Sequence, residues 1–208
     1  FYFPKFFHPD PSVKRQSGFL MPSFVNSSSV GTSINTPYFK VLSDNKDLTL
    51  NPRFYSSKKL MLQSEYRQVE KNSKYLLDFS FLRDSASSMK GHFFAKTNKT
   101  IDFLNFDESE LFLNLQQSSH NTYLKAYDLK SPIIRSANIL ESSLKLAAYS
   151  ENTSLDTKIS IYEDLSKNDN DKFEYVYPSY NLTKIHSLDG KTNSNFTIIS
   201  RSGYFFKV

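Results

Sequence analysis

The chain has 208 residues and contains neither cysteine nor tryptophan, which excludes disulfides, thiolate metal ligands and a cysteine nucleophile from this stretch. Lysine and arginine (26) exceed aspartate and glutamate (21), but the two signs are interspersed, so no basic stripe for nucleic acid is indicated. Aromatic residues make up 15% of the chain and favour strands over helices. No run of about 18 apolar residues is present, which excludes a transmembrane helix.

Residues 1–16 hold three of the eight prolines and end on a basic pair, Lys14 and Arg15. We expect them to be the tail of a preceding unit and a linker. The chain starts without methionine and stops after the strand-like Tyr204 to Phe206, so we expect an internal piece of a longer polypeptide.

From Ser17 onward one pattern repeats, in which about ten residues of alternating apolar and polar character are followed by a polar turn. Such alternation has the period of a strand and gives a sheet two unlike faces. The pattern predicts about eleven strands, at 17–26, 30–43, 46–56, 59–71, 74–84, 89–98, 101–118, 139–150, 154–166, 172–186 and 194–208.

One face of these strands is predicted to be apolar and the other polar. The apolar set comprises Leu48, Leu50, Leu62, Leu77, Phe79, Leu113, Leu144 and Ile159. The polar set comprises Arg53, Glu65, Arg67, Asp78, Lys145 and Lys158. The segments are about twice as long as the strands of a soluble sandwich, and aromatic residues lie near their ends. Both features are typical of an antiparallel outer-membrane β-barrel, although high β-propensity alone would also produce them.

The connections alternate in length, as they do in outer-membrane barrels. The short ones are SDN, EKNS, TNK and SENT, and the longer ones include RDSASSMKG, SKNDNDK and the segment from Ser118 to Asn138. The alternation fails at SSKK and SLDGKTNS, which have the wrong lengths for their sides.

Catalytic and cofactor sites are not indicated. The four histidines, His8, His92, His120 and His186, are far apart and lack metal-ligand spacing, so we interpret them as surface or lumen residues. A phosphate-binding glycine loop and a nucleophile elbow are both missing from the sequence. We therefore predict no enzymatic activity, no metal and no cofactor.

Two prolines carry more information. Pro22 lies in the middle of the first segment and Pro37 in the middle of the second. Proline removes a backbone donor from a ladder, so these two positions predict a weak seam at one end of the sheet. The alternative is a pair of bulges, since Pro52 and Pro178 also lie within predicted strands.

Five motifs in the chain are specific: K-R-x-S-G-F-L-x-P-S at Lys14–Ser23, P-Y at Pro37–Tyr38, D-L-T-L-x-P-R at Asp47–Arg53, E-Y-R at Glu65–Arg67 and NTYLKAYDL at Asn121–Leu129. Together they resemble a known family, the LptD lipopolysaccharide-assembly proteins of the outer membrane, also called organic solvent tolerance proteins. The resemblance covers roughly residues 1–70 and 119–130. Elsewhere only the strand pattern is shared.

The resemblance implies an outer-membrane lipopolysaccharide translocon of a Gram-negative bacterium, which inserts lipopolysaccharide into the outer leaflet. Residues 1–16 would end a periplasmic jelly-roll domain and its hinge, and 17–208 would form the N-terminal part, about eleven strands, of a larger barrel. Pro22 and Pro37 would be the lateral gate. The polar set would contact the glycan or the plug. The implied partners are lipopolysaccharide, an LptE-like lipoprotein plug and a periplasmic LptA-like jelly-roll bridge. Two alternatives stay open, a general outer-membrane porin and a periplasmic β-rich binding or scaffold protein.

Overall fold

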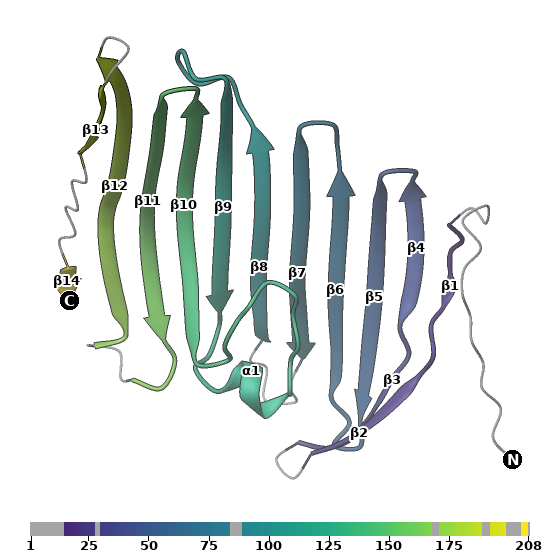
Figure 1. The fold of residues 1–208 in the computed structure, drawn as a ribbon. Helices are drawn as coiled ribbons and strands as arrows, with labels where there is room; N and C mark the ends of the chain where they lie inside the picture. The colour runs from purple at the N-terminus through teal and green to yellow at the C-terminus, as the bar shows by residue number, and fades with distance from the viewer. Residues whose placement is uncertain are drawn as a thin grey trace, which may run out of the picture.

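The computed structural model describes residues 15–27, 30–83, 89–167, 171–188, 192–198 and 205–207. Within them the strands form one antiparallel sheet (Figure 1). The first strands are short: β1 (Gly18–Phe19), β2 (Ser23–Ser27), β3 (Gly31–Asn35) and β4 (Tyr38–Ser43). The long strands are β5 (Lys46–Tyr55), β6 (Leu60–Val69), β7 (Ser73–Arg83), β8 (Met89–Thr100), β9 (Glu108–Ser118), β10 (Ile139–Ser150), β11 (Thr153–Asp164) and β12 (Phe173–Leu188). The last are β13 (Thr192–Ile198) and β14 (Phe205–Lys207), and one short helix, α1 (Tyr123–Ala126), follows β9.

The order of strands in the sheet follows their order in the chain. From β4 to β13 each strand pairs with the next one, while β1 pairs with β4, β2 with β3, β3 with β5 and β14 with β12. The predicted all-β antiparallel class is therefore confirmed. The sheet itself is open, because no described ladder joins β1 to β13. The one described helix is far shorter than a membrane-crossing helix would be.

Three features differ from the predicted strands. The last predicted strand, 194–208, is described as two strands, β13 and β14, which both pair with β12. Residues 101–107 were expected to begin a strand, but they form a loop, in which Leu104 has a φ of 51° and the rings of Phe103 and Phe106 stack with centroids 6.2 Å apart. The first two predicted strands are each divided in two near their prolines, which cannot donate to a ladder, whereas Pro52 and Pro178 lie within the undivided strands β5 and β12. The remaining long strands lie where the alternation predicts them, within a few residues at their ends.

The connections lie on two rims of the sheet. We call the rim with the turns 44–45, 70–72 and 151–152 the turn rim, and the loop 101–107 lies on the same rim (Figure 1). The opposite rim, the loop rim, carries residues 56–59 and the long segment 119–138 with α1. The predicted alternation of lengths is thus only partly correct, since the loop 101–107 is long and the turn 56–59 is short.

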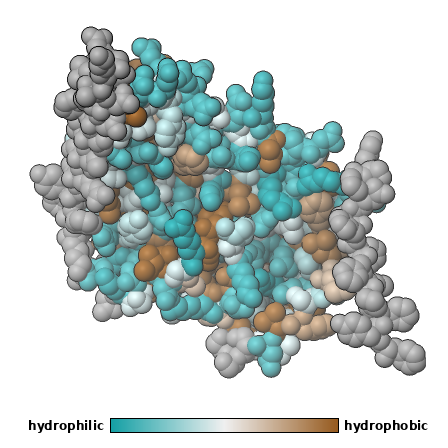
Figure 2. Space-filling model, in the orientation of Figure 1, coloured by the Kyte–Doolittle hydropathy of each residue, from teal (hydrophilic) through white to brown (hydrophobic). Residues whose placement is uncertain are grey.

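Register places the two predicted sets on opposite faces of the sheet. Leu48 is paired through Tyr66 with Leu77, and Leu113 is paired with Leu144, which is paired with Ile159. Paired residues point to the same side of a sheet, so the apolar set forms one continuous apolar face. The opposite, polar face is the one covered by residues 119–138, and the view of Figure 2 from this side is hydrophilic over most of its area.

Burial on the two faces is inverted relative to a soluble sheet. On the apolar face Leu144 is 43% exposed, Ile159 45% and Phe81 49%. On the polar face Asp78 and Ser80 are 0% exposed. Buried polar groups combined with a large exposed apolar surface indicate that the apolar face meets something other than water.

Candidate functional site: the polar face of the sheet

The two seam prolines lie close together at a break in strand pairing. Pro22 is between β1 and β2, and Pro37 is between β3 and β4. The pairs Phe19↔Tyr38 and Ser23↔Asn35 bracket this break. Across the break the backbone N–H of Leu20 donates to the carbonyl oxygen of Pro37 at 2.8 Å. The first two strand segments are therefore joined by an interrupted ladder.

A group of charged side chains lies on the turn rim of the polar face. Asp47 on β5 is the centre of it, with a side chain only 6% exposed. The guanidinium of Arg15 donates to one of its carboxylate oxygens, and Arg67 Nε donates to the other at 2.7 Å. Glu65 Oε1 lies 3.6 Å from Arg67 Nε. We call these four residues the rim cluster.

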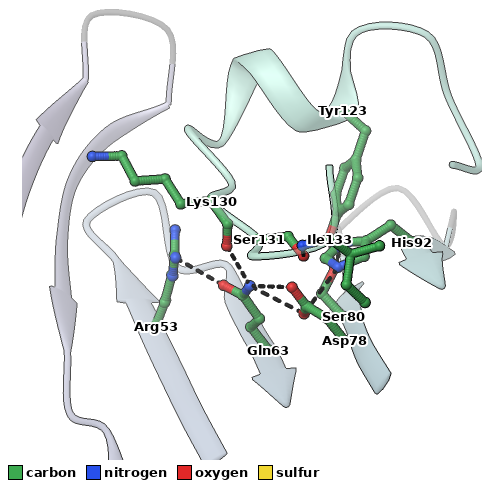
Figure 3. A network of polar contacts seen from close by, with 9 residues as sticks. All are labelled: Arg53, Gln63, Asp78, Ser80, His92, Tyr123, Lys130, Ser131 and Ile133. Atoms are coloured by element: carbon green, nitrogen blue, oxygen red, sulfur yellow. Dashed lines mark hydrogen bonds and ion pairs between the residues drawn. The ribbon is translucent and has the colours of Figure 1, made fainter. Parts of the chain in front are cut away.

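A second group, the buried network, lies under residues 119–138 (Figure 3). Its centre is Gln63, which accepts from Arg53 Nη2 at 2.8 Å and donates to Asp78 Oδ1 at 3.2 Å and to the Lys130 carbonyl at 3.0 Å. Arg53 Nη1 also donates to the Tyr127 carbonyl at 3.2 Å. Strand side chains therefore satisfy two backbone carbonyls of the covering segment, as buried carbonyl groups require.

The network continues to α1 through a histidine. His92 Nε2 lies 3.2 Å from Asp78 Oδ1, its Nδ1 lies 2.7 Å from Ser80 Oγ, and Ser80 Oγ lies 2.8 Å from the Tyr123 hydroxyl. The ring of His92 also stacks on Phe94 with centroids 4.3 Å apart. Burial raises the pKa of Tyr123 from its ordinary 10.0 to about 12, because the charged phenolate would lose its hydration there.

Asp78, His92 and Ser80 are arranged in the order of a serine hydrolase triad. A nucleophilic serine has to reach a substrate, whereas Ser80 is 0% exposed and its hydroxyl contacts Tyr123. The geometry therefore supports a structural function, in which strand residues hold α1 against the sheet.

An apolar core surrounds this network. It joins strand residues to the covering segment and consists of Tyr55, Met61, Leu82, Phe94, Tyr123, Leu124, Tyr127, Leu129, Ile133, Leu140 and Leu165. At the start of the covering segment, the Ser119 N–H donates to the Gly91 carbonyl at 2.9 Å. A Cβ at Gly91 would lie 2.3 Å from the Ser80 carbonyl oxygen, so only glycine fits there. Residues 119–138 are thus packed as part of the fold.

Beside this covered region the polar face is open. A groove of about 1030 Å³ lies over β8 to β12, next to residues 133–136. Lys145 Nζ lies 2.8 Å from Asp156 Oδ1, and Lys158 Nζ lies 2.6 Å from Glu141 Oε1. Lys96 and Arg135 add two positive charges, so four cationic and two acidic side chains line the groove. Its charge is suited to an anionic ligand.

The six residues of the predicted polar set lie on this face in three places. Arg53 and Asp78 belong to the buried network, Glu65 and Arg67 to the rim cluster, and Lys145 and Lys158 to the groove. Sequence analysis missed the partners of these residues, namely Asp47, Gln63, His92 and Tyr123. His92 was interpreted as a surface or lumen residue, but its side chain is 0% exposed. The strand alternation places it beside Ser80, and the ring of Tyr123 from α1 lies next to it, with centroids 6.3 Å apart, in a contact that the strand pattern does not indicate.

The fold and the polar face define a class of protein, a wall of long antiparallel strands with an exposed apolar side and a polar side covered by its own chain. A comparison of the chain with known proteins then gives its relatives. The chain is 36% identical over 91 residues to the LPS-assembly protein LptD of Pseudomonas aeruginosa (strain UCBPP-PA14), which is 44% of this chain and 10% of that protein. It is 38% identical over 90 residues to the LPS-assembly protein LptD of Pseudomonas putida (strain W619), which is 43% of this chain and 10% of that protein.

These matches confirm the resemblance to LptD that the motifs indicated, so the chain is LptD-like over about two fifths of its length. The matched stretch spans about a tenth of the length of each relative. No family model matches the chain.

Replacing Gln63 by leucine tests the buried network. Leucine keeps a comparable volume but removes one hydrogen-bond partner each from Arg53, Asp78 and the Lys130 carbonyl, which we expect to cost about 2 kcal/mol of docking free energy. Hydrogen exchange of the amides in 119–138, followed by mass spectrometry, should become faster. Gln117→Leu, an exposed amide on the apolar face, is the control. Equal exchange in both variants would contradict a stabilising network.

The raised pKa of Tyr123 predicts a dependence on pH. The unfolded side chain loses its proton near its ordinary pKa of 10.0, whereas the docked one keeps it until about 12. Docking should therefore be fully stable below pH 10 and should weaken as the pH rises from 10 to 12. The same exchange measurement across this range should show the loss in the native protein and a smaller loss in Tyr123→Phe. A loss of equal size in the variant would assign it to other groups.

Proposed function

We propose that the chain is part of the wall of an LptD-type outer-membrane β-barrel that takes part in lipopolysaccharide assembly. The observation that carries the proposal is the inverted polarity of the sheet, with exposed leucine, isoleucine and phenylalanine on one face and buried Asp78, Arg53 and His92 on the other. In a bilayer this is the favourable arrangement, because lipid chains cover the apolar face and the polar face lines the lumen.

Strand dimensions support the same proposal. β5 and β6 have 10 residues each, β7 and β9 have 11, and β8, β10 and β11 have 12. A tilted strand needs about 9–11 residues to cross the hydrocarbon core. A closed wall would also satisfy the strand edges, which lipid cannot hydrogen-bond. We propose that strands beyond those in this sheet complete the wall, in keeping with relatives about ten times longer than the matched stretch.

The relatives are named for lipopolysaccharide assembly, and the chemistry of that lipid fits both faces. Its acyl chains are stable in the bilayer, and its charged glycan is stable in water. A closed wall would keep the acyl chains, together with the glycan, in the polar lumen. A seam that opens sideways lets the acyl chains enter lipid while the glycan uses the polar side. In this proposal the seam opens at the outer edge of β1, beside the ladder that is interrupted at Pro22 and Pro37, where proline lacks a donor that would strengthen the pairing.

In this proposal the polar face contacts the glycan of lipopolysaccharide and the partner proteins. The groove carries more cationic than acidic side chains and is suited to glycan phosphates, which Lys96, Arg135, Lys145 and Lys158 would contact. Residues 119–138 occupy the face over β5 to β8 near the loop rim, so an LptE-like plug would lie against the remainder.

In this proposal the turn rim faces the periplasm. We also propose the division into 1–16, the end of a jelly-roll domain with its hinge, and 17–208, with an LptA-like bridge upstream. Residues 1–14 lie outside the described part of the chain, and Arg15 lies on the turn rim, beside Asp44.

Arginine on the apolar face tests the membrane position. Leu144→Arg and Ile159→Arg place a charge in the lipid and should each lower the free energy of unfolding by about 2–4 kcal/mol in bilayers. Ser143→Arg, on the polar face of the same strand, should cost little. Unfolding by denaturant of the protein inserted in phospholipid vesicles gives these values. A larger cost for Ser143→Arg than for Leu144→Arg would reverse the assignment of the faces.

Replacing Pro22 and Pro37 by alanine tests the seam. The change restores two backbone donors, each bond being worth about 1 kcal/mol, so the seam should open less often. Surface lipopolysaccharide should decrease in a strain that depends on this protein, while assembly of the barrel in the outer membrane stays normal.

The control for this experiment is Pro178→Ala in β12, far along the sheet from the seam. Pro52 is less suitable, because its carbonyl accepts from the Thr36 N–H at 3.2 Å, directly beside Pro37. Normal surface lipopolysaccharide in the double variant, or an equal decrease in Pro178→Ala, would remove the support for a proline gate and return these residues to the role of bulges.

A further inference from the structure

The chain enters the sheet through a strand with very little ladder. β1 contributes only two register pairs, Gly18↔Phe39 and Phe19↔Tyr38, whereas the ladder between β5 and β6 is continuous from Lys46 to Phe54. Each backbone hydrogen bond contributes only modestly. The attachment of residues 15–19 therefore depends on their side-chain contacts.

Most of these contacts come from Arg15. Its guanidinium donates to the Asp47 carboxylate and to the Asp44 carbonyl at 3.4 Å, and it lies over the ring of Phe39 at 5.6 Å from the centroid. Two residues on, Ser17 Oγ accepts from the Val41 N–H at 2.8 Å. Arg15 thus contacts both β4 and β5 from outside the sheet.

The surroundings of Asp47 favour a contact with Arg15. Its side chain is 6% exposed, and Arg67 on β6, its direct partner in register, holds the other carboxylate oxygen. A nearly buried carboxylate needs cationic partners, and here one of them belongs to the wall while the other belongs to the entering segment. Loss of Arg15 would leave the wall intact and release only the segment.

We propose that Asp47 is a positioning residue that locks residues 15–19 onto the sheet. This lock keeps the β1–β4 pair closed, so the lateral seam opens at the outer edge of β1. The part of the inference that concerns the seam rests on the proposed function. The lock itself concerns a local equilibrium that can be measured without transport.

Trypsin reports on the lock, because it must bind the arginine side chain in its own pocket before cutting after it. The purified protein in detergent micelles is digested briefly, and mass spectrometry compares the cut after Arg15 with the cut after Lys71, an exposed residue on the same rim. We expect Asp47→Asn to raise the Arg15 to Lys71 ratio about fivefold or more. Asp44→Asn is the matched control, since it removes a charge from the same turn but leaves the Asp47 carboxylate in place.

The wild-type protein provides an independent test if Asp47→Asn does not assemble. Arg15 is 45% exposed, so salt screens its contact, and the same ratio should rise between about 0.05 and 0.5 M salt. A ratio unchanged by salt, or unchanged in an assembled Asp47→Asn protein, overturns the lock.

Surface lipopolysaccharide in the same variants separates the two proposals. Faster cutting with reduced surface lipopolysaccharide supports both the lock and its position at the seam. Faster cutting with normal surface lipopolysaccharide supports the lock and contradicts a lateral seam at β1. Reduced lipopolysaccharide without faster cutting contradicts the lock and leaves the proposed transport function standing.

Discussion

The continuous register of the long ladders decides where every side chain lies. Each strand alternates between two faces, and pairing carries the alternation to its neighbour, so Asp78 comes beside Glu65 and Phe79 beside Ser64. A slip of one residue between β6 and β7 would move Asp78 to the apolar face and Phe79 to the polar one. The two unlike faces, and with them the groove, the rim cluster and the buried network, exist only while this register holds.

Gathering polar residues on one face creates a cost that the fold has to offset. Near the loop rim the side chains of the polar face are buried from water. An unpaired Arg53 or Asp78 there would lower the stability by several kcal/mol. Residues 119–138 remove this cost because they bring carbonyls for Arg53 and Gln63 and a hydroxyl for Ser80, together with leucine and tyrosine side chains for the apolar core. Away from this segment the same face stays open, and there the charges pair with one another across β10 and β11.

Sequence alone predicts what depends on neighbours in the chain. The long strands, their facing and the proline breaks follow from alternation and from the missing proline donor, because these are properties of a few consecutive residues. The loop at 101–107 was missed, since Ile101 and Phe103 have the spacing of a strand, whereas the ring of Phe103 stacks on that of Phe106. The buried network was missed because its partners are far apart: Arg53 and the Tyr127 carbonyl are 74 residues apart, and Ser80 and Tyr123 are 43 apart. No local pattern marks such pairs.

The motifs that resemble the LptD family meet in space at these same contacts. Arg15, Asp47 and Arg67 come from three separate motifs and meet at one carboxylate, while Arg53, from the same motif as Asp47, donates to the Tyr127 carbonyl in the motif at Asn121–Leu129. Residues of this kind are constrained by a partner of fixed charge and geometry, so a change in one leaves another buried and unpaired. Positions on the apolar face have no such partner, and any apolar side chain of suitable size serves there. These polar contacts therefore depend on particular residues, whereas the apolar face depends on the alternation and on the size of its side chains.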